Sequence, residues 1–372
     1  VDGRLRLLDP PPAALRERLL SRLKVLARLD IAERRLAQDG QMDWSQPGQT
    51  VHLRVSTLPT LHGEKIVLRV LDTRQLPLSL PALGYSARDL HTLTQALARP
   101  HGLVLLTGPT GSGKTASLYS CLTHLQHEAV NIASVEDPSE IPLEGINQVS
   151  VNERAGLSFA HALRALLRQD PDILMVGEIR DLETAQIAIQ AAQTGHLVLS
   201  TLHTNDAPST LVRLRNMGVA PYNIAASVSL ITAQRLVRRL CMLCRTPAKL
   251  SASALRQAGL PSTDTTEYRV FTPQGCPACH KGFKGRTGIF EVMPVSTALQ
   301  DLIVQEADSL RLERQARQDG MRSLRRASDY NSKAAGVYVQ DLAQLRPDFK
   351  LLGGLRFDHL DGEYFTNTIP AN

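Results

Sequence analysis

Eight consecutive residues could hold the phosphates of a nucleotide. They fill every fixed position of the phosphate-binding loop pattern, and three of them are glycines, which let successive backbone N–H groups turn toward one anion. The lysine of the pattern is placed to contact the β- and γ-phosphates, and the threonine after it to bind Mg²⁺. The eight residues are Gly108, Pro109, Thr110, Gly111, Ser112, Gly113, Lys114 and Thr115.

Two neighbouring elements must position this loop. The apolar run 103–106 directly precedes it and predicts a strand, and residues 116–125 predict a helix whose positive end would face the phosphates. A chance glycine turn is the alternative interpretation. The strand before the loop and the helix after it favour the nucleotide site.

Two more apolar runs lead into acidic residues. One of them is followed by Glu136, Asp137 and, three residues later, Glu140. Three carboxylates in a proline-bent turn suit a hydrated Mg²⁺ or the positioning of an attacking water, whereas a solvated acidic loop is the plain alternative. The run 173–176 leads to Glu178 and predicts a buried parallel strand that ends in the second magnesium-handling acid of a P-loop enzyme.

A third apolar run, 197–202, lies between two histidines. His203 follows the run and could sense the γ-phosphate, while His196 precedes it and could cap the entrance of the strand. Either histidine alone would more often be structural.

Four of the five cysteines form two pairs, each with two residues between its members. Such pairs supply thiolates on tight turns and predict a closed tetrahedral zinc site, with a redox disulfide as the alternative. The pairs are Cys241 with Cys244 and Cys276 with Cys279. Cys121 falls in the helix predicted after the loop, and we expect it in the core.

Length and composition fit an intracellular enzyme of about two or three domains. The chain has 372 residues, 43% hydrophobic and 4% aromatic, and a net charge of +6. A slight basic excess with few aromatic residues is weak evidence for nucleic acid, so no nucleic-acid partner is expected. Without a run of ~18 apolar residues or a signal-peptide pattern, the sequence predicts a cytoplasmic protein. Because the chain begins at Val1 inside a strand-like run, we expect it to lack its natural N-terminus.

Periodicity divides the chain into successive parts. Helical spacing over 13–29 and strand patterns over 51–56 and 64–71 predict a small α/β domain. Alternating strand and helix signals then predict an α/β fold with a parallel sheet wound on the phosphate loop. The expected parts are 1–72, the small domain; 73–82, a linker; 83–240, the phosphate-loop domain; 241–290, the zinc segment; 291–327, C-terminal helices; and 328–372, an unrelated tail.

Seven segments together resemble the secretion-type ATPases, the hexameric motors of type II secretion and type IV pilus assembly. The resemblance covers residues 1–326 in the family's order. It implies a RecA-like P-loop ATPase domain preceded by a small PAS-like α/β domain. It also implies a homo-hexamer that uses ATP and Mg²⁺ and docks on an inner-membrane platform protein, peripheral to the cytoplasmic face of that membrane. The segments are 29–35, 54–57, 108–115, 136–140, 167–172, 177–181 and 200–205.

The resemblance also implies a role for individual residues. Glu140 would be the general base that orients water on the γ-phosphate, Glu178 would help to hold Mg²⁺ and that water, and His203 would read the phosphate state. Arg54 and Arg69 match positions from which the family reaches a nucleotide as cationic fingers. Without the family, these two arginines would be taken as surface residues on strands.

Two further segments bear on which branch of the family the chain resembles. Residues 223–231 and 283–292 are more similar to the pilus-extension branch than to the secretion branch. Pilus assembly is therefore the expected function, and type II secretion is the alternative. Ala116 departs from the family, which usually has a hydroxyl residue there, but Thr115 remains available for Mg²⁺.

Two other classes of function stay open at this point. One is a non-enzymatic zinc-and-nucleotide switch that binds ATP only to change shape. The other is a nucleic-acid translocase, because four arginines cluster in the sequence beside the predicted zinc site. They are Arg235, Arg238, Arg239 and Arg245.

The tail departs from the family from Ser328 onward. The runs 336–342 and 350–358 predict two strands and resemble a strand pair of a TonB-dependent outer-membrane receptor. An isolated hairpin of this kind should be marginally stable. We therefore expect 328–372 to contribute nothing to the motor.

Overall fold

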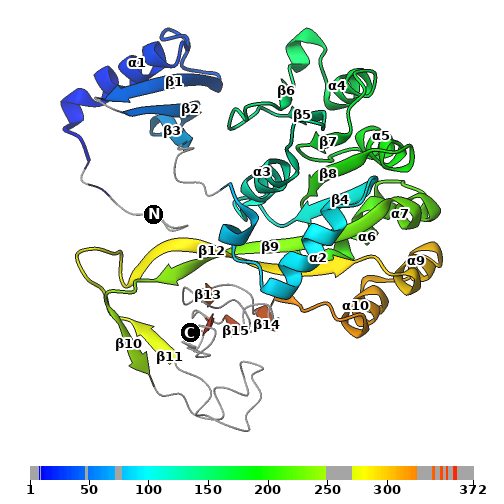
Figure 1. The fold of residues 1–372 in the computed structure, drawn as a ribbon. Helices are drawn as coiled ribbons and strands as arrows, with labels where there is room; N and C mark the ends of the chain where they lie inside the picture. Colours follow the sequence, from blue (N-terminus) through cyan, green and yellow to red (C-terminus); the bar gives the residue numbers. More distant parts are fainter. Residues whose placement is uncertain are drawn as a thin grey trace. The chain divides into compact units, whose positions relative to one another are not determined.

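The computed structural model describes residue 8, residues 10–46, 49–71, 78–248 and 270–324, and the backbone of four short strands beyond residue 336. It separates into two compact units, one of Arg4–Leu76 and one of Pro77–Asn372 with Val1–Gly3. Figure 1 labels the elements of both units.

The smaller unit is one helix packed on an antiparallel sheet. Met42 and Val55 are buried against the helix, and the strand order is β1-β2-β3. The predicted helix and two of the strands are confirmed, whereas the first strand was not anticipated. The elements are η1 (Ala13–Leu15), α1 (Arg16–Leu26), β1 (Gln38–Gln46), β2 (Gln49–Thr60) and β3 (Gly63–Leu71).

The larger unit is built on a parallel sheet, as predicted. Six strands pair in parallel in the order β9-β4-β8-β7-β5-β6, and β12 pairs antiparallel with β9. The central strands are fully buried, which explains their unbroken apolar runs. The strands are β4 (Gly102–Thr107), β5 (Ile132–Glu136), β6 (Asn147–Ser150), β7 (Ile173–Val176), β8 (Leu197–Leu202), β9 (Val228–Leu240) and β12 (Phe283–Pro294).

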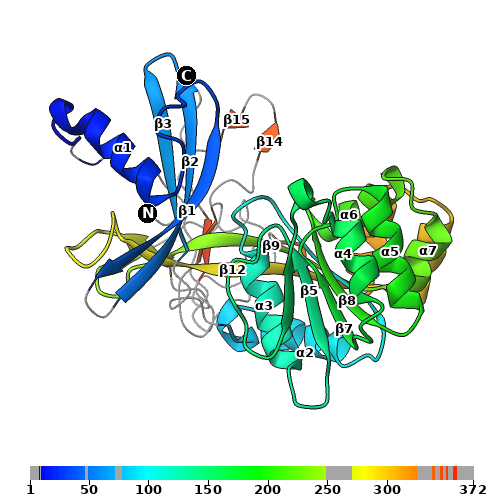
Figure 2. The same cartoon turned by 90° about the horizontal axis from the view of Figure 1, so that it is seen from above.

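Helices cover both faces of this sheet (Figure 2). On one face lie η3 (Leu80–Leu83), α2 (Ala87–Leu97) and α3 (Lys114–Leu125). The other face carries α4 (Phe159–Leu166), which follows η4 (Glu153–Ala155), together with α5 (Leu182–Gln193), α6 (Ala207–Asn216), α7 (Pro221–Ser227), α9 (Thr297–Val304) and α10 (Ser309–Gln318). Leu80 is buried in the core, so packing of this unit begins within the range 73–82 that was expected to be a linker.

Side-chain caps distinguish α3 from most of these helices. Six helices begin at a serine or aspartate whose side chain accepts a backbone N–H of the first turn. The N-cap of α3 is Gly113, with a φ of 89° and no side-chain hydrogen bond. The first N–H groups of α3 are therefore left for another partner. Among the described residues, every helix is too short or too polar to cross a membrane.

The cysteine segment is an insertion between two strands of the sheet rather than a separate block. Cys241 directly follows β9, and three residues separate Cys279 from the start of β12. Between them, β10 (Arg245–Ala248) and β11 (Val270–Pro273) pair antiparallel (Figure 1). The boundary expected at residue 290 falls inside β12.

Beyond residue 336 the short stretches of backbone that the structure describes form two pairs of strands. The predicted pairing of its strands is confirmed for β13 (Val337–Val339) and β16 (Leu355–Phe357), while β14 (Gln344–Arg346) pairs with β15 (Phe349–Lys350). The expectation of an isolated hairpin is wrong, because β13 also pairs with β9 at the edge of the large sheet.

Candidate active site

Four parallel strands deliver the predicted functional segments to one edge of the sheet. Strands β4, β5, β7 and β8 run side by side, with Thr107 opposite Leu202 and Val135 opposite Val176. Their carboxyl ends lead into the phosphate loop, the acidic turn after Glu136, Glu178 and His203. The carboxyl edge is where open α/β sheets bind ligands, so these segments share one candidate site.

The phosphate loop requires its glycines. Gly108, Gly111 and Gly113 have φ values of 153°, 77° and 89°, which favour glycine over other residues. A Cβ on Gly108 would also lie 2.5 Å from both the Ser112 Oγ and the Gln234 carbonyl oxygen. The loop is therefore closed too tightly for a side chain at this position.

The loop and the start of α3 fit a phosphate group. The Lys114 Nζ donates to the carbonyl oxygens of Gly108 at 2.7 Å and Pro109 at 3.2 Å, which holds the ammonium over the loop. Burial lowers the pKa of Lys114, and the charge of Glu178 opposes that shift. Ser112 Oγ is buried without a hydrogen-bond partner among the described residues. With the uncapped helix, these donors suit an anion such as a nucleotide phosphate.

Glu178 and His203, two of the predicted site residues, lie side by side. His203 Nε2 lies 3.3 Å from Glu178 Oε2, and the Glu178 side chain is 19% exposed. Arg180 forms ion pairs with both Glu178 and Asp137, the latter at 3.3 Å. Arg180 thus connects the carboxylates that follow β5 and β7, a role that sequence reasoning missed.

The acidic turn divides into buried and exposed carboxylates. Glu136 is 4% exposed and accepts hydrogen bonds from Ser134 Oγ at 2.7 Å, Gln148 Nε2 at 3.1 Å and the Tyr119 hydroxyl. The prediction that it joins the other two in a hydrated magnesium site is therefore wrong for Glu136, because its oxygens are engaged in the core. Asp137 and Glu140 are exposed.

Two adjacent residues of β9, the strand next to β4, form hydrogen bonds with segments of the candidate site. Gln234 Nε2 donates to the Ser112 carbonyl oxygen at 2.8 Å. The Arg235 guanidinium donates to the Asn205 carbonyl oxygen at 3.0 Å and to its Oδ1 at 3.1 Å. These contacts tie the phosphate loop and the segment after His203 to one strand, and nothing in the local sequence indicated them.

His196 and Cys121, two further predicted residues of the larger unit, are not at this edge of the sheet. His196 is at the amino end of β8, where its Nδ1 lies 3.1 Å from the Ala191 carbonyl oxygen, which fits the structural interpretation. Cys121 is in the core as expected, and burial raises its pKa to about 12. Arg54 and Arg69 belong to the smaller unit and lie directly opposite each other on β2 and β3. Their role as cationic fingers stays a prediction.

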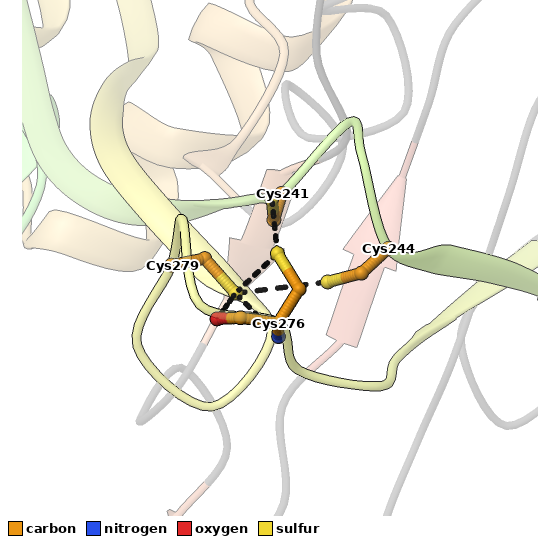
Figure 3. A group of neighbouring side chains, drawn as sticks. All are labelled: Cys241, Cys244, Cys276 and Cys279. Atoms are coloured by element: carbon orange, nitrogen blue, oxygen red, sulfur yellow. Dashed lines mark hydrogen bonds between the residues drawn. The ribbon is translucent and has the colours of Figure 1, made fainter.

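The four paired cysteines converge on one point (Figure 3). Their sulfur atoms all lie within 4.8 Å of one another, with separations of 3.8 Å for Cys241 to Cys276 and 3.6 Å for Cys244 to Cys279. A zinc ion with Zn–S bonds of about 2.3 Å places its sulfurs roughly 3.8 Å apart, whereas a disulfide needs about 2.05 Å. The cluster therefore fits zinc better than a disulfide.

Fold and site together define a P-loop protein with a RecA-like parallel sheet and an appended tetracysteine cluster. Residues 1–344 match the family described as "Type II/IV secretion system protein". The chain belongs to this family. The match enters the 328–372 tail and ends within it.

Relatives of known name include both pilus and secretion proteins. The chain is 52% identical over 330 residues to the type IV pilus assembly ATPase PilB of Acinetobacter baylyi, covering 88% of this chain and 57% of the relative. It is 51% identical over 325 residues to PilB of Pseudomonas aeruginosa, covering 87% and 57%. It is 48% identical over 318 residues to the type II secretion system ATPase E of Vibrio cholerae, covering 85% and 63%. The chain thus spans less than two thirds of each of these relatives.

Solved structures support the fold. The pilus retraction motor PilT with bound ADP is 26% identical, with a TM-score of 0.53 over 79% of this chain and 77% of that one. The ATPase DotB of Legionella pneumophila has a TM-score of 0.55 at 22% identity, over 78% of this chain and 71% of that one. The expected RecA-like α/β class is therefore confirmed.

Proposed function

We propose that this chain is the ATP-hydrolysing part of a motor that powers type IV pilus assembly. The observation that carries the proposal is the convergence of the phosphate loop, Glu178 and His203 on one sheet edge, with His203 Nε2 3.3 Å from Glu178. The names and identities of the relatives support the pilus assignment. Type II secretion is the alternative, supported by relatives of nearly equal identity.

In the proposed mechanism, the phosphate loop binds and orients the triphosphate. The N–H groups at the start of α3 and the Lys114 ammonium would hold the β- and γ-phosphates, and Thr115 and Glu178 would hold Mg²⁺. When bound, Mg²⁺ would neutralise charge that develops on the transferred phosphoryl group. Glu140 would orient and deprotonate the attacking water, and His203, fixed beside Glu178, would respond to the γ-phosphate.

Purified protein and three variants test this assignment. We expect the parent to release phosphate from ATP with Mg²⁺, Lys114→Ala to lose nucleotide binding, and Glu140→Gln to bind nucleotide but turn over at least about a hundredfold more slowly. Glu144→Gln, at an exposed acid later in the same loop, is the matched control and should keep the parent rate. A parent that never releases phosphate would refute hydrolysis, and equal rates in Glu140→Gln and the parent would remove Glu140 from the role of base.

The rival nucleic-acid function has less support. Two of the four arginines near the cysteines stack on aromatic rings, Arg238 on Phe283 at 3.8 Å and Arg245 on Phe271 at 4.0 Å. Arg235 is bonded to Asn205. Three of the four arginines therefore make contacts within the protein that explain their presence without nucleic acid. Stimulation of turnover by DNA that weakens with added salt would favour the rival.

We further propose that the motor is a homo-hexamer at the cytoplasmic face of the inner membrane, docked on a platform protein. The membership of the chain in the secretion family supports this assembly. Sedimentation of the parent, with a nonhydrolysable ATP analogue, only at the mass of a single chain would contradict the hexamer.

A further inference from the structure

A buried tyrosine connects the phosphate loop to the acidic turn. Tyr119 lies on α3, five residues after Lys114, and its side chain is fully buried. At 1.5 Å per residue, its backbone is about 7.5 Å along the helix from the lysine. Because α3 begins at the phosphate loop, the backbone of Tyr119 has a fixed position relative to that loop.

The Tyr119 hydroxyl makes two contacts with the segment that contains the proposed base. It donates to the carboxylate of Glu136 and accepts the backbone N–H of Glu140 at 3.1 Å. Glu136 ends β5, and Glu140 follows four residues later. One hydroxyl therefore joins both ends of the acidic turn to α3.

Gln148, from the neighbouring strand β6, completes this network. Its Nε2 donates to Glu136 Oε1 at 3.1 Å and to the Ile141 carbonyl oxygen at 3.0 Å, and its Oε1 accepts the Leu143 N–H at 2.6 Å. The backbone just after Glu140 is therefore held as well. A buried polar network whose members are all bonded specifies one geometry.

We propose that Tyr119 is a positioning residue that sets the distance between the phosphate loop and Glu140. Its catalytic consequence rests on the proposed hydrolysis. The Glu140 carboxylate must reach a water in line with the γ-phosphate, and the phosphate is held at the start of the same helix that carries Tyr119. Small displacements of a catalytic group are costly: about 1 Å can lower a rate by about a hundredfold.

The test compares Tyr119→Phe with the parent and with Tyr85→Phe. Tyr85 is a second buried tyrosine of the same unit, stacked on Phe290 with centroids 3.6 Å apart, and serves as the matched control. We expect Tyr119→Phe to lower kcat about tenfold or more, with the Kd of a fluorescent ATP analogue changed less than about twofold, because the loop is intact. Tyr85→Phe should change neither quantity.

Hydrogen exchange supplies a readout that does not need turnover. The Glu140 amide should exchange faster in Tyr119→Phe than in the parent, because its acceptor is gone. Glu136→Gln disturbs the same hydroxyl from its other side and should shift exchange and kcat in the same directions, which covers the case in which Tyr119→Phe fails to fold.

The outcomes separate this inference from the proposed function. Unchanged exchange at Glu140, or faster exchange with an unchanged kcat, would overturn the positioning role. A fall in kcat matched by an equal loss of folded protein would show that Tyr119 only fills the core. If the parent never hydrolyses ATP, the proposed function fails, and the exchange data alone decide whether Tyr119 holds the segment.

Discussion

At the scale of single residues, a buried acid on β12 joins two distant parts of the larger unit. Glu291 is 3% exposed and accepts the backbone N–H of Ala207 at 2.7 Å and of Leu324 at 3.2 Å. It therefore ties the first turn of α6, just after the His203 segment, to the chain beyond α10. Burial raises its pKa to about 7, the charges of Asp206 and Glu313 add to the rise, and the two N–H donors oppose it.

This shift makes stability depend on pH. The folded protein holds a proton on Glu291 up to about pH 7, whereas the unfolded chain releases it near 4.5. The stability contributed by the raised pKa is thus fully present below the unfolded value and is lost as pH rises toward 7, by up to about 3 kcal/mol. We expect the free energy of unfolding of Glu291→Gln, measured with denaturant from pH 5 to 8, to rise relative to that of the parent as pH rises. Glu128→Gln, at an exposed turn, should follow the parent, and parallel curves for all three proteins would contradict the prediction.

The positions of the candidate site residues were predictable because each follows an apolar strand. Glu178 and His203 carried that signal, and so did the whole phosphate loop. Tyr119 and Gln234 did not, because their partners lie 17 or more residues away along the chain, and only the packed sheet brings them together. The burial of Glu136 was missed for a similar reason, since two of its three donors come from other elements, Tyr119 on α3 and Gln148 on β6.

At the scale of elements, the strands with clear apolar patterns were predicted and β1 was not. β1 has the sequence Gln-Asp-Gly-Gln-Met-Asp-Trp-Ser-Gln, in which only Met42 and Trp44 are large and apolar. Its strand conformation comes from pairing with β2 along nine positions. The pairing of β12 with β9 was likewise not predicted. The two strands are separated in the sequence by the inserted cysteine segment, and antiparallel pairing over that distance leaves no recognisable pattern of residues.

Zinc in the cysteine cluster should stabilise this inserted element without serving the nucleotide site. We expect about one zinc per chain in the parent and a loss of most of it in Cys276→Ser, because three thiolates hold the ion less well than four. In Cys276→Ser, backbone amide hydrogen exchange should be faster in β10 and β11, while the affinity for nucleotide stays near that of the parent. Zinc content measured by mass spectrometry decides the first point, with Cys121→Ala as the control from the fifth cysteine. A metal-free parent that keeps a protected β10–β11 pair would contradict a structural zinc.

At the scale of the whole molecule, the smaller unit carries a charge arrangement that folding alone does not explain. Arg54 and Arg69 are directly opposed across β2 and β3, and like charges in this position destabilise a sheet. Val55, the neighbour of Arg54 on β2, is buried in the cluster under α1, so alternation along the strand places both arginines on the face away from that helix. Two guanidinium groups on one face of a sheet suit an anionic ligand such as a triphosphate.

The arginine pair should therefore act in turnover rather than in the binding of nucleotide by the phosphate loop. We expect Arg54→Ala with Arg69→Ala to lower kcat by ~10³ or more if both stabilise the charge that builds on the phosphoryl group. The Kd measured with a fluorescent ATP analogue should stay within a few-fold of the parent. Arg18→Ala with Arg22→Ala removes the same charge from exposed positions of α1 and serves as the control. If the two double variants hydrolyse ATP equally fast, the arginines of the sheet are surface residues. If the Arg54 and Arg69 variant instead loses affinity while kcat is unchanged, the pair contributes to ground-state binding and not to the transition state.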